Sequence, residues 1–438
     1  MNNSTSCRVT WRLGTLGNGG ELINTMPAQI RALFHTGIDE GMDEIDDQVV
    51  RAHCVGWLKV LKENGLLVAD VWDGPTKIMT LLPTVADFDV PPLPSEEGSA
   101  ETGHALVLSR FAYARPANDG VLFCHPDAPC DVLVVDRDFL WQLLSPHMPQ
   151  EDEAPGAHGR PAMGILLRLG IVLPAGAAED TASATWEFHD RIHQAAWRPA
   201  NEFSRNGRTH RFGRGAQPNF HRTGHAPVEH VELPAPDQAK SRDFSDVLAS
   251  RRSIREHSEK FVSLPTLSHL LHSACRTQTH ESRSEREMVF RPYPSGGAVH
   301  ELNFTLFARR CEGLKQGVYH YDCATHSVAR LPGGEVMVGP AFKTAAETSN
   351  EAIVNAAGLI IVSSEMPKLA WYYEGIAEKV TLINAGCALQ TLHLAATNLD
   401  LAGWIIGHSF AREFEAATGR FSIEAIPIAA FAFGHPAD

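Results

Sequence analysis

Residues 291–303 read Arg291-Pro292-Tyr293-Pro294-Ser295-Gly296-Gly297-Ala298-Val299-His300-Glu301-Leu302-Asn303, a helix-breaking run that leads into a strand with acid and amide side chains. The two glycines allow backbone N–H groups to approach a flat ligand where any Cβ would collide, and the serine adds a hydroxyl donor. The same pattern is also typical of a tight surface loop. Its interpretation therefore depends on other segments of the chain.

The composition is that of a globular protein. A chain of 438 residues with 44% hydrophobic and 8% aromatic residues predicts roughly two to four domains with a substantial core. The net charge of −14 disfavours a nucleic-acid surface, which needs clustered Lys and Arg. The polar segment 1–20 does not resemble a signal peptide, and the longest apolar runs are too short to span a bilayer. We therefore expect a cytoplasmic protein without a membrane or nucleic-acid partner.

Cysteine and histidine patterns do not predict a metal site. The eight cysteines occur singly, without a Cys-x-x-Cys pair, which is typical of reduced thiols in the cytoplasm. Four histidines, His210, His221, His225 and His230, lie in a segment rich in Gly, Arg, Asn and Pro. That composition favours a solvated linker over a structural zinc site.

The N-terminal half contains two segments with the same order of elements. Residues 47–63 follow a helical period, Asn64-Gly65 ends the helix and residues 66–71 form a strand candidate. The pattern returns at 163–173, after a strand at 130–135 and a helix at 137–144. This layout predicts winged-helix-like modules at 1–95 and 104–197, with linkers at 91–103 and 198–240. Tandem modules of this kind can bind DNA, but the acidic charge favours peptide binding or plain packing.

The remaining part of the chain, residues 241–438, alternates helix and strand patterns. Such alternation predicts a domain in which a sheet is flanked by helices. The fold class that we predict for the whole chain is α+β.

An arginine-rich segment follows the first helix of this domain. Arg251, Arg252 and Arg255, together with the hydroxyl of Ser253, have a spacing that allows them to converge on a dianionic phosphate. A solvated basic helix end would have the same composition, so both interpretations stay open here.

Two later segments complete the pattern. The helix at 381–398 carries small residues at helical spacing, which is typical of a dimer-forming helix but also of an ordinary core helix. The apolar strand at 401–407 is bounded by glycines, and its backbone amides could reach the edge of a flavin ring. As a lone motif it is an ordinary buried strand.

Together these segments resemble the nitroreductase superfamily of FMN enzymes and, within it, the SagB-type dehydrogenases that oxidise azolines to azoles in ribosomally made peptides. The resemblance covers about residues 241–434, through Arg251–Arg255, Pro294–Ala298, the run Gly317-Val318-Tyr319-His320-Tyr321-Asp322, and residues 390–396. The N-terminal half resembles the winged-helix modules of longer members of that group, through residues 108–113 and 186–190.

The resemblance implies a homodimeric FMN domain at 241–438 with FMN at the interface, so that each site uses residues of both chains. It also implies a precursor peptide whose leader engages the N-terminal modules, and a cyclodehydratase partner that makes the azoline. The implied FMN contacts are Arg251, Arg252, Ser253 and Arg255 for the phosphate, Pro294, Ser295, Gly296 and Gly297 near the ring, and Gly403, Trp404 and Ile405 at its other edge.

One position departs from the family pattern. Members of this type carry Trp-Lys-Tyr-x-Gly-x-Ala, whereas this chain reads Trp371-Tyr372-Tyr373-Glu374-Gly375-Ile376-Ala377. A buried lysine is more easily tuned to accept a proton near neutral pH than a tyrosine is, because tyrosine has a reference pKa of about 10. Three explanations stay open: Tyr373 alone suffices; a neighbour such as Glu374, Glu378 or Lys379 supplies the base; or the substrate differs from an azoline. Alternatively, the aromatic residues of this segment form a wall on which the substrate stacks.

The predicted function is an FMN-dependent dehydrogenase, or oxidase, that converts peptide azolines to azoles. A base, Tyr373 or Tyr372, would remove one ring proton while hydride passes to flavin N5, and oxygen would regenerate the flavin. The alternatives are an FMN oxidoreductase for another peptide or small molecule and a non-catalytic scaffold that holds a precursor peptide.

Overall fold

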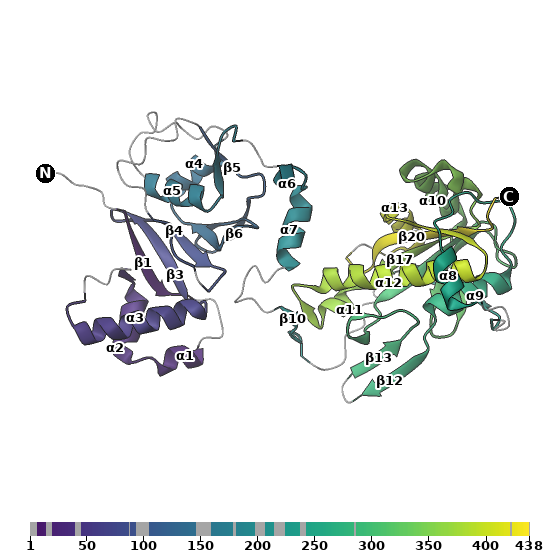
Figure 1. Ribbon diagram of the computed structural model, residues 1–438, viewed down its shortest axis with the longest axis horizontal. Helices are drawn as coiled ribbons and strands as arrows, with labels where there is room; N and C mark the ends of the chain where they lie inside the picture. Colours follow the sequence, from purple (N-terminus) through teal and green to yellow (C-terminus); the bar gives the residue numbers. More distant parts are fainter. Residues whose placement is uncertain are drawn as a thin grey trace. The chain divides into compact units, whose positions relative to one another are not determined.

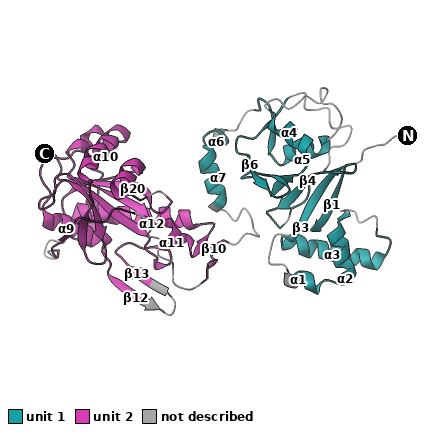
Figure 2. Ribbon diagram, turned by 180° about the vertical axis from the view of Figure 1, so that it is seen from behind, with its two compact units in different colours: residues 1–205 teal, residues 206–438 magenta. Residues whose placement is uncertain are grey.

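The computed structural model describes residues 7–14, 20–39, 45–86, 88–92, 105–145, 159–177, 181–197, 206–213, 224–236, 242–283, 286–420 and 423–437. The chain divides into two compact units, residues 1–205 and 206–438 (Figure 2). Of the predicted linkers, residues 93–103, 198–205, 214–223 and 237–240 lie outside the described residues, and so does His221.

A seven-stranded antiparallel sheet forms the centre of the first unit (Figure 1). Its strand order is β2-β1-β3-β4-β8-β7-β6. A separate two-stranded sheet pairs β5 with β9. The strands are β1 Cys7–Leu13, β2 Ile38–Asp39, β3 Leu67–Asp73, β4 Thr76–Pro83, β5 Leu106–Leu108, β6 Tyr113–Ala117, β7 Gly120–Cys124, β8 Cys130–Val134 and β9 Val172–Pro174. The helices are α1 Gly20–Thr25, α2 Ala28–Thr36, α3 Gln48–Glu63, α4 Arg137–Leu144, α5 Arg160–Arg168, α6 Thr181–Ala184 and α7 Phe188–Trp197.

The predicted helix and strand that meet at Asn64-Gly65 are confirmed. The carboxylate of Asp47 accepts the backbone N–H groups of Val49 and Val50, which satisfies two of the donors that a helix leaves unpaired at its start. Gly65 has a φ of 64°, a left-handed conformation that ends α3, and the chain returns as β3. Gly170 has a φ of 71° and performs the same function between α5 and β9.

The two predicted modules share one sheet and one core. β4 from the first segment pairs with β8 from the second, with Met79 opposite Val134 and Pro83 opposite Cys130. A single hydrophobic cluster contains Trp11 of the first segment and Phe139 of the second. The structure therefore joins these segments within one compact unit, and their winged-helix character stays a prediction.

The second unit is built on another seven-stranded antiparallel sheet, with strand order β11-β16-β15-β14-β17-β20-β19. Two small hairpins pair β12 with β13 and β10 with β18. The strands are β10 Gly207–Arg208, β11 Glu229–Glu232, β12 Thr279–Arg283, β13 Arg286–Phe290, β14 Leu302–Ala308, β15 Gly317–Asp322, β16 Ser327–Arg330, β17 Gly358–Ser364, β18 Tyr373–Glu374, β19 Ala402–Ile406 and β20 Ile426–Gly434. The helices are α8 Phe244–Ser250, α9 Leu264–Cys275, α10 Glu335–Thr348, α11 Met366–Ala370, α12 Ala377–Asn398 and α13 Ala411–Thr418, with short 3₁₀ turns at Gly296–Ala298 and Glu351–Asn355.

Helices cover both faces of this sheet, which explains why its central strand is a continuous apolar run. In β17, Ile360 and Val362 belong to the core that contains α9 and α12, whereas Leu359 and Ile361 belong to the core that contains α10 and α13. Because side chains alternate along a strand, each face of β17 needs its own apolar set. The mixed α and β character predicted for this half is confirmed.

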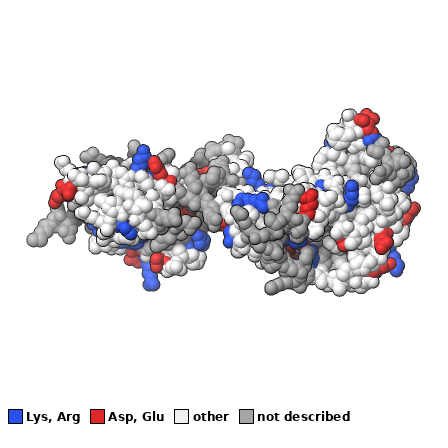
Figure 3. Space-filling view, turned by 90° about the horizontal axis from the view of Figure 1, so that it is seen from below, with Lys and Arg blue, Asp and Glu red and all other residues white. Residues whose placement is uncertain are grey.

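Two further features of the described residues are the distribution of their charged side chains and the character of their helices. In the view of Figure 3, Lys and Arg side chains are interspersed with acidic and uncharged ones. No helix within the described ranges combines the length and the apolar character that a membrane span requires.

Candidate functional site

The loop between β13 and β14 has an unusual backbone. Gly297 adopts a left-handed φ of 64°, and Ala298 and His300 adopt φ values of 54° and 48°. Left-handed backbone at non-glycine residues costs about 1–3 kcal/mol each and persists only where the surroundings hold it. The loop must therefore be fixed by contacts from elsewhere in the unit.

A buried polar network, formed by Ser295, Glu301 and Asn384, provides these contacts. The Asn384 amide nitrogen donates to Glu301 Oε1 at 3.0 Å and to Ser295 Oγ at 3.2 Å, while its oxygen accepts the Gly296 N–H at 3.0 Å. Ser295 Oγ lies 3.3 Å from Glu301 Oε2 and accepts the His300 N–H at 3.0 Å. Side chains from α12 and from the start of β14 thus hold the glycine turn.

Burial shifts the pKa values of two titratable groups in this loop, Glu301 and His300. Glu301 is fully buried, and burial raises the pKa of its carboxyl even though Asn384 and Ser295 hydrogen-bond to it. Burial, together with the nearby Arg291, lowers the pKa of His300 to about 4. The loop is held by hydrogen bonds from Asn384 and Ser295 to the Glu301 carboxyl.

Gly296 brings the loop to one of the predicted catalytic residues. A Cβ at this position would lie 2.3 Å from Val380 Cγ1, so a side chain here would require the Val380 side chain to move. The same Cβ would lie 3.9 Å from the hydroxyl oxygen of Tyr373. The phenol of Tyr373 therefore lies beside the glycine turn.

The arginine segment lies against strand β19. After α8 the chain is extended, and the Ile254 N–H donates to the Gly403 carbonyl at 3.2 Å. His393 Nε2 of α12 lies 2.9 Å from the Arg252 carbonyl oxygen, to which it can only donate. The side chains of Arg252, Ser253 and Arg255 are exposed, and that of Arg251 is partly buried.

Within β19 the predicted residues point in different directions. Trp404 is buried in the core on the α10 side, and the Arg255 guanidinium lies 5.1 Å from the centre of its ring. Gly403 and Ile405 lie on the other face; a Cβ at Gly403 would lie 2.6 Å from the Phe431 ring. Among the described strands, β19 stands at the edge of its sheet, so one side of its backbone is not paired with another described strand.

The glycine loop and the arginine segment contact opposite ends of α12. Asn384 holds the loop and His393 holds the arginine segment. At 1.5 Å per residue these positions are about 13 Å apart along the helix axis. One chain therefore presents the two predicted ligand-binding groups as separate clusters.

Tyr372 and Tyr373 have different environments. Tyr372 is only 7% exposed and packs edge-on against His210, with ring centres 5.9 Å apart. Tyr373 is partly buried and faces Gly296. Of the other predicted bases, Glu374 accepts a hydrogen bond from Thr209 at 2.8 Å, and Glu378 and Lys379 lie in the first turn of α12.

Residues 206–213, here called the strap, cover this segment. β10 of the strap pairs with β18, with Gly207 opposite Glu374 and Arg208 opposite Tyr373. The His210 N–H donates to the Tyr372 carbonyl at 3.3 Å, and Phe212 stacks on Trp371 with ring centres 4.9 Å apart. This part of the predicted linker is therefore a component of the candidate site. Its composition is that of a linker, so the sequence did not identify it as part of the site.

Asn384 was also not identified from sequence. The signal that could have identified it is the position of an asparagine among small apolar residues in the predicted helix. A polar side chain buried in such a helix needs hydrogen-bond partners from elsewhere in the fold. Within the described ranges, no group of three or more His, Cys, Asp or Glu residues is arranged to hold a metal ion.

Comparison with known proteins identifies the C-terminal part. The sequence profile described as the Nitroreductase family matches residues 248–435. A candidate nitroreductase of Methanocaldococcus jannaschii is 28% identical over 183 residues, which is 42% of this chain and 86% of that protein.

Solved structures with related folds include a candidate nitroreductase of Anabaena variabilis, with 18% identity, a TM-score of 0.40 and coverage of 50% of this chain and 43% of the other. This chain thus spans less than half of the Anabaena protein. The Escherichia coli microcin synthetase complex with truncated pro-microcin bound has 17% identity, a TM-score of 0.36 and coverage of 48% and 79%. A Desulfovibrio desulfuricans candidate nitroreductase in complex with FMN has 20% identity, a TM-score of 0.30 and coverage of 45% and 88%. The C-terminal part of the chain contains a nitroreductase-family domain, and the members of that family are generally FMN-dependent oxidoreductases.

Proposed function

We propose that the C-terminal domain binds FMN and oxidises azoline rings of a ribosomally made peptide to azoles. The observation that carries the proposal is the position of the Tyr373 hydroxyl beside Gly296, in a loop that a buried network holds in place. This arrangement puts a group able to move a proton next to the backbone that would face a flat ring.

The residues present suit FMN. Arg251, Arg252 and Arg255 with Ser253 offer guanidinium and hydroxyl donors to a phosphate, and most of these side chains are exposed to an incoming ligand. At the ring end, Gly296 packs closely against Val380 and Gly297 turns the chain through a left-handed conformation, which together shape the loop that would face the ring. Bound FMN would supply a two-electron acceptor for the hydride that leaves the substrate.

We further propose a homodimer formed through α12. Its exposed stripe contains Leu382, Ile383, Gly386 and Gln390, and nothing lies within 4 Å of the position of a Gly386 Cβ. A small residue at the centre of an apolar stripe permits close approach of a second helix. An antiparallel pair of α12 helices would bring the glycine loop of one chain toward the arginine segment of its partner, which accounts for their separation within one chain.

In this proposal Tyr373 is the base. The substrate ring loses one hydrogen as hydride and one as a proton; the side chain of Tyr373 must be in its phenolate form to accept that proton, and it becomes the neutral phenol in the step. The strap pairs with the backbone of Tyr373 and engages the Glu374 carboxylate, so it restrains the residue on both sides. Tyr372 is buried against His210 and has a packing role.

The burial of Tyr372 also favours a second candidate function. The position that holds lysine in the SagB-type pattern is occupied here by a side chain that packs under the strap. This supports an FMN oxidoreductase that acts on a different peptide or small molecule.

The N-terminal unit would bind the precursor peptide. A cavity of about 300 Å³ beside α3 has apolar walls from Val55, Leu58 and Phe88, with the ion pairs Lys59–Glu63 and Lys62–Asp89 at its edge. An apolar side chain of a leader segment would fit there. A cyclodehydratase partner and a cytoplasmic location belong to the same proposal.

The test is mass spectrometry of an azoline-bearing peptide incubated with the FMN-loaded protein. The proposal predicts a loss of two hydrogens per ring, abolished by Tyr373→Phe and retained by the matched control Tyr372→Phe. An unchanged peptide mass with fully FMN-loaded protein and its partner proteins present would eliminate azoline oxidation and leave the second candidate. A protein that takes up no FMN would eliminate both.

A further inference from the structure

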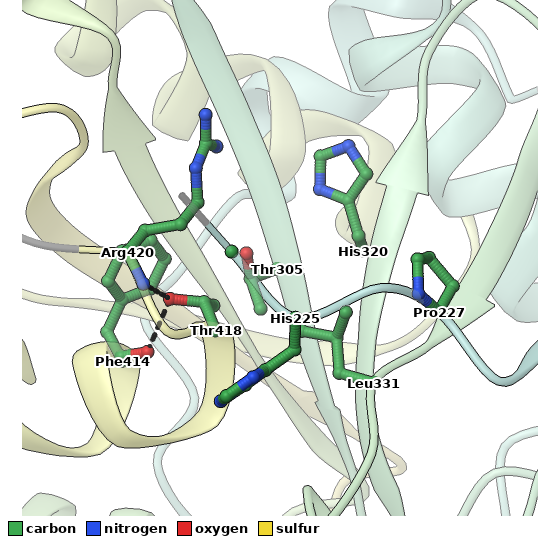
Figure 4. A pocket seen from close by; sticks show the side chains of 9 residues that line it. His225, Pro227, Thr305, His320, Leu331, Phe414, Thr418 and Arg420 are labelled. Atoms are coloured by element: carbon green, nitrogen blue, oxygen red, sulfur yellow. Dashed lines mark hydrogen bonds between the residues drawn. The ribbon is translucent and has the colours of Figure 1, made fainter. Parts of the chain in front are cut away.

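A cavity of about 250 Å³ lies on the α10 and α13 side of the second unit's sheet (Figure 4). Thr305 of β14 lies on the same face as Phe307, which belongs to the core with α10 and α13, whereas Leu306 faces α12. The cavity is therefore on the opposite face of the sheet from α12, which holds the glycine loop. Its lining residues are Gly224, His225, Pro227, Thr305, His320, Leu331, Phe414, Thr418 and Arg420.

Hydrogen-bond donors line one part of this cavity. Thr305 and His320 are directly opposite each other on neighbouring strands β14 and β15. Figure 4 shows the side chains of Arg420, Thr305 and His320 around the same cavity. Leu331 and Phe414 supply apolar wall, and none of the described lining residues is Asp or Glu.

The guanidinium at the cavity, that of Arg420, also belongs to an ion-pair cluster. Arg420 donates to Glu365 Oε1 at 2.6 Å, and Lys368 forms an ion pair with the other oxygen of the same buried carboxylate. A guanidinium with adjacent hydroxyl and imidazole donors matches the oxygens of phosphate or carboxylate.

Contacts at the end of α13 hold Arg420 at the cavity. The Thr418 hydroxyl accepts the Arg420 N–H at 3.2 Å and donates to the Phe414 carbonyl at 2.7 Å, as Figure 4 shows. The His225 N–H donates to the Thr418 carbonyl at 2.8 Å. The backbone that carries the guanidinium is therefore fixed by the Thr418 hydroxyl and by the contact of His225 with the Thr418 carbonyl.

We propose that this cavity binds a small oxyanion, the phosphate or carboxylate group of a small molecule, through Arg420, Thr305 and His320. A water molecule occupies roughly 30 Å³ in the liquid, so the cavity can hold such a group together with part of the molecule that carries it. The site is separate from the proposed FMN site and does not depend on FMN binding.

The test is a titration of the full-length, FMN-loaded protein with inorganic phosphate and, in a second arm, with acetate. Binding is followed by calorimetry and by the thermal midpoint, with chloride at the same ionic strength as the reference. We expect phosphate, acetate or both to bind more tightly than chloride; the arm that responds identifies the class of anion.

Four variants assign the binding to this cavity. Thr305→Val keeps the shape and the Arg420–Glu365 pair and should weaken binding about tenfold, since one hydrogen bond to a charged group is lost. Arg420→Gln should weaken it further. The matched control Arg412→Gln removes an exposed arginine of α13 and should have no effect on anion binding, and Arg252→Gln, in the proposed FMN phosphate segment, should have none either.

Two results would overturn the proposal. In the first, neither anion binds the wild type more tightly than chloride. In the second, binding is unchanged in Thr305→Val and Arg420→Gln, or is lost only in Arg252→Gln.

Discussion

Replacement of Asn384 by alanine tests whether the buried network holds the glycine loop. In the wild type this side chain contacts the Gly296 N–H, Ser295 Oγ and both oxygens of Glu301, at 3.0–3.2 Å. The substitution leaves the backbone of α12 intact, because alanine is the best helix former. Its effects therefore report on the polar network rather than on the helix.

The expected loss of stability follows from the groups left without Asn384. A buried donor or acceptor that loses its partner costs about 1–3 kcal/mol. The Gly296 N–H lies in a partly buried loop that water can reach, so the loss of its partner should cost about 1 kcal/mol. Glu301 is fully buried, so the loss of its hydrogen bonds from Asn384 should cost about 2–3 kcal/mol. The sum is about 3–4 kcal/mol, a large part of the typical 5–15 kcal/mol stability of a domain.

Urea unfolding at pH 7 measures this loss, and quenching of flavin fluorescence measures the FMN affinity. We expect a weakening of FMN binding by about tenfold or more, because about 1.4 kcal/mol of loop ordering corresponds to a factor of ten. The matched control is Asn398→Ala at the other end of α12, where the side chain accepts only the Arg242 N–H and the expected cost is about 1 kcal/mol. If Asn384→Ala costs no more than Asn398→Ala and FMN affinity is unchanged, the network does not hold the loop.

Three further substitutions test other parts of the account. Phe212→Ala removes the stacking on Trp371, so proteolysis within the strap should become faster at unchanged FMN content; Phe261→Ala, an equally exposed phenylalanine, should not do this. Leu382→Glu on the exposed stripe of α12 should shift sedimentation from dimer to monomer, while Val336→Glu on α10 leaves it unchanged; identical sedimentation of both variants would refute the proposed interface. His257 is buried, and burial lowers its pKa to about 4 in the folded protein. As pH falls from about 6.5 toward 4, the imidazole takes up a proton in the unfolded chain but not yet in the folded protein. The free energy of unfolding therefore decreases over this range, by up to about 3 kcal/mol. In His257→Leu the difference in unfolding free energy between pH 7 and pH 4.5 should shrink by most of that amount; an unchanged difference would contradict the assignment.

The sequence predicted the features that depend on local pattern. Asp47 and Gly65 mark the ends of a helix by chemistry that acts within a few residues, and the structure confirms both. The nitroreductase-type domain was predicted because the arginine segment, the glycine loop and the strand at 401–407 occur in a recognisable order. The proximity of Ile254 to Gly403 then follows from the fold.

Features that depend on pairing between distant segments were not predicted. The pairing of β4 with β8 joins residues about fifty positions apart, and no local pattern specifies which strand edge meets which. The strap has the Gly, Arg and His composition of a linker, and only its contacts with Trp371–Glu374 make it part of the site. The role of Asn384 likewise depends on the loop brought to it from almost ninety residues away.

The FMN content of the purified full-length protein, measured by its absorption spectrum and by titration with added FMN, tests the central claim most directly. We predict flavin absorption bands and one FMN bound per chain, with affinity reduced by at least tenfold in Arg252→Gln and unchanged in Arg412→Gln. A colourless protein that takes up no FMN, or one whose FMN affinity is the same in both variants, would contradict the assignment of the arginine segment and the glycine loop as an FMN site.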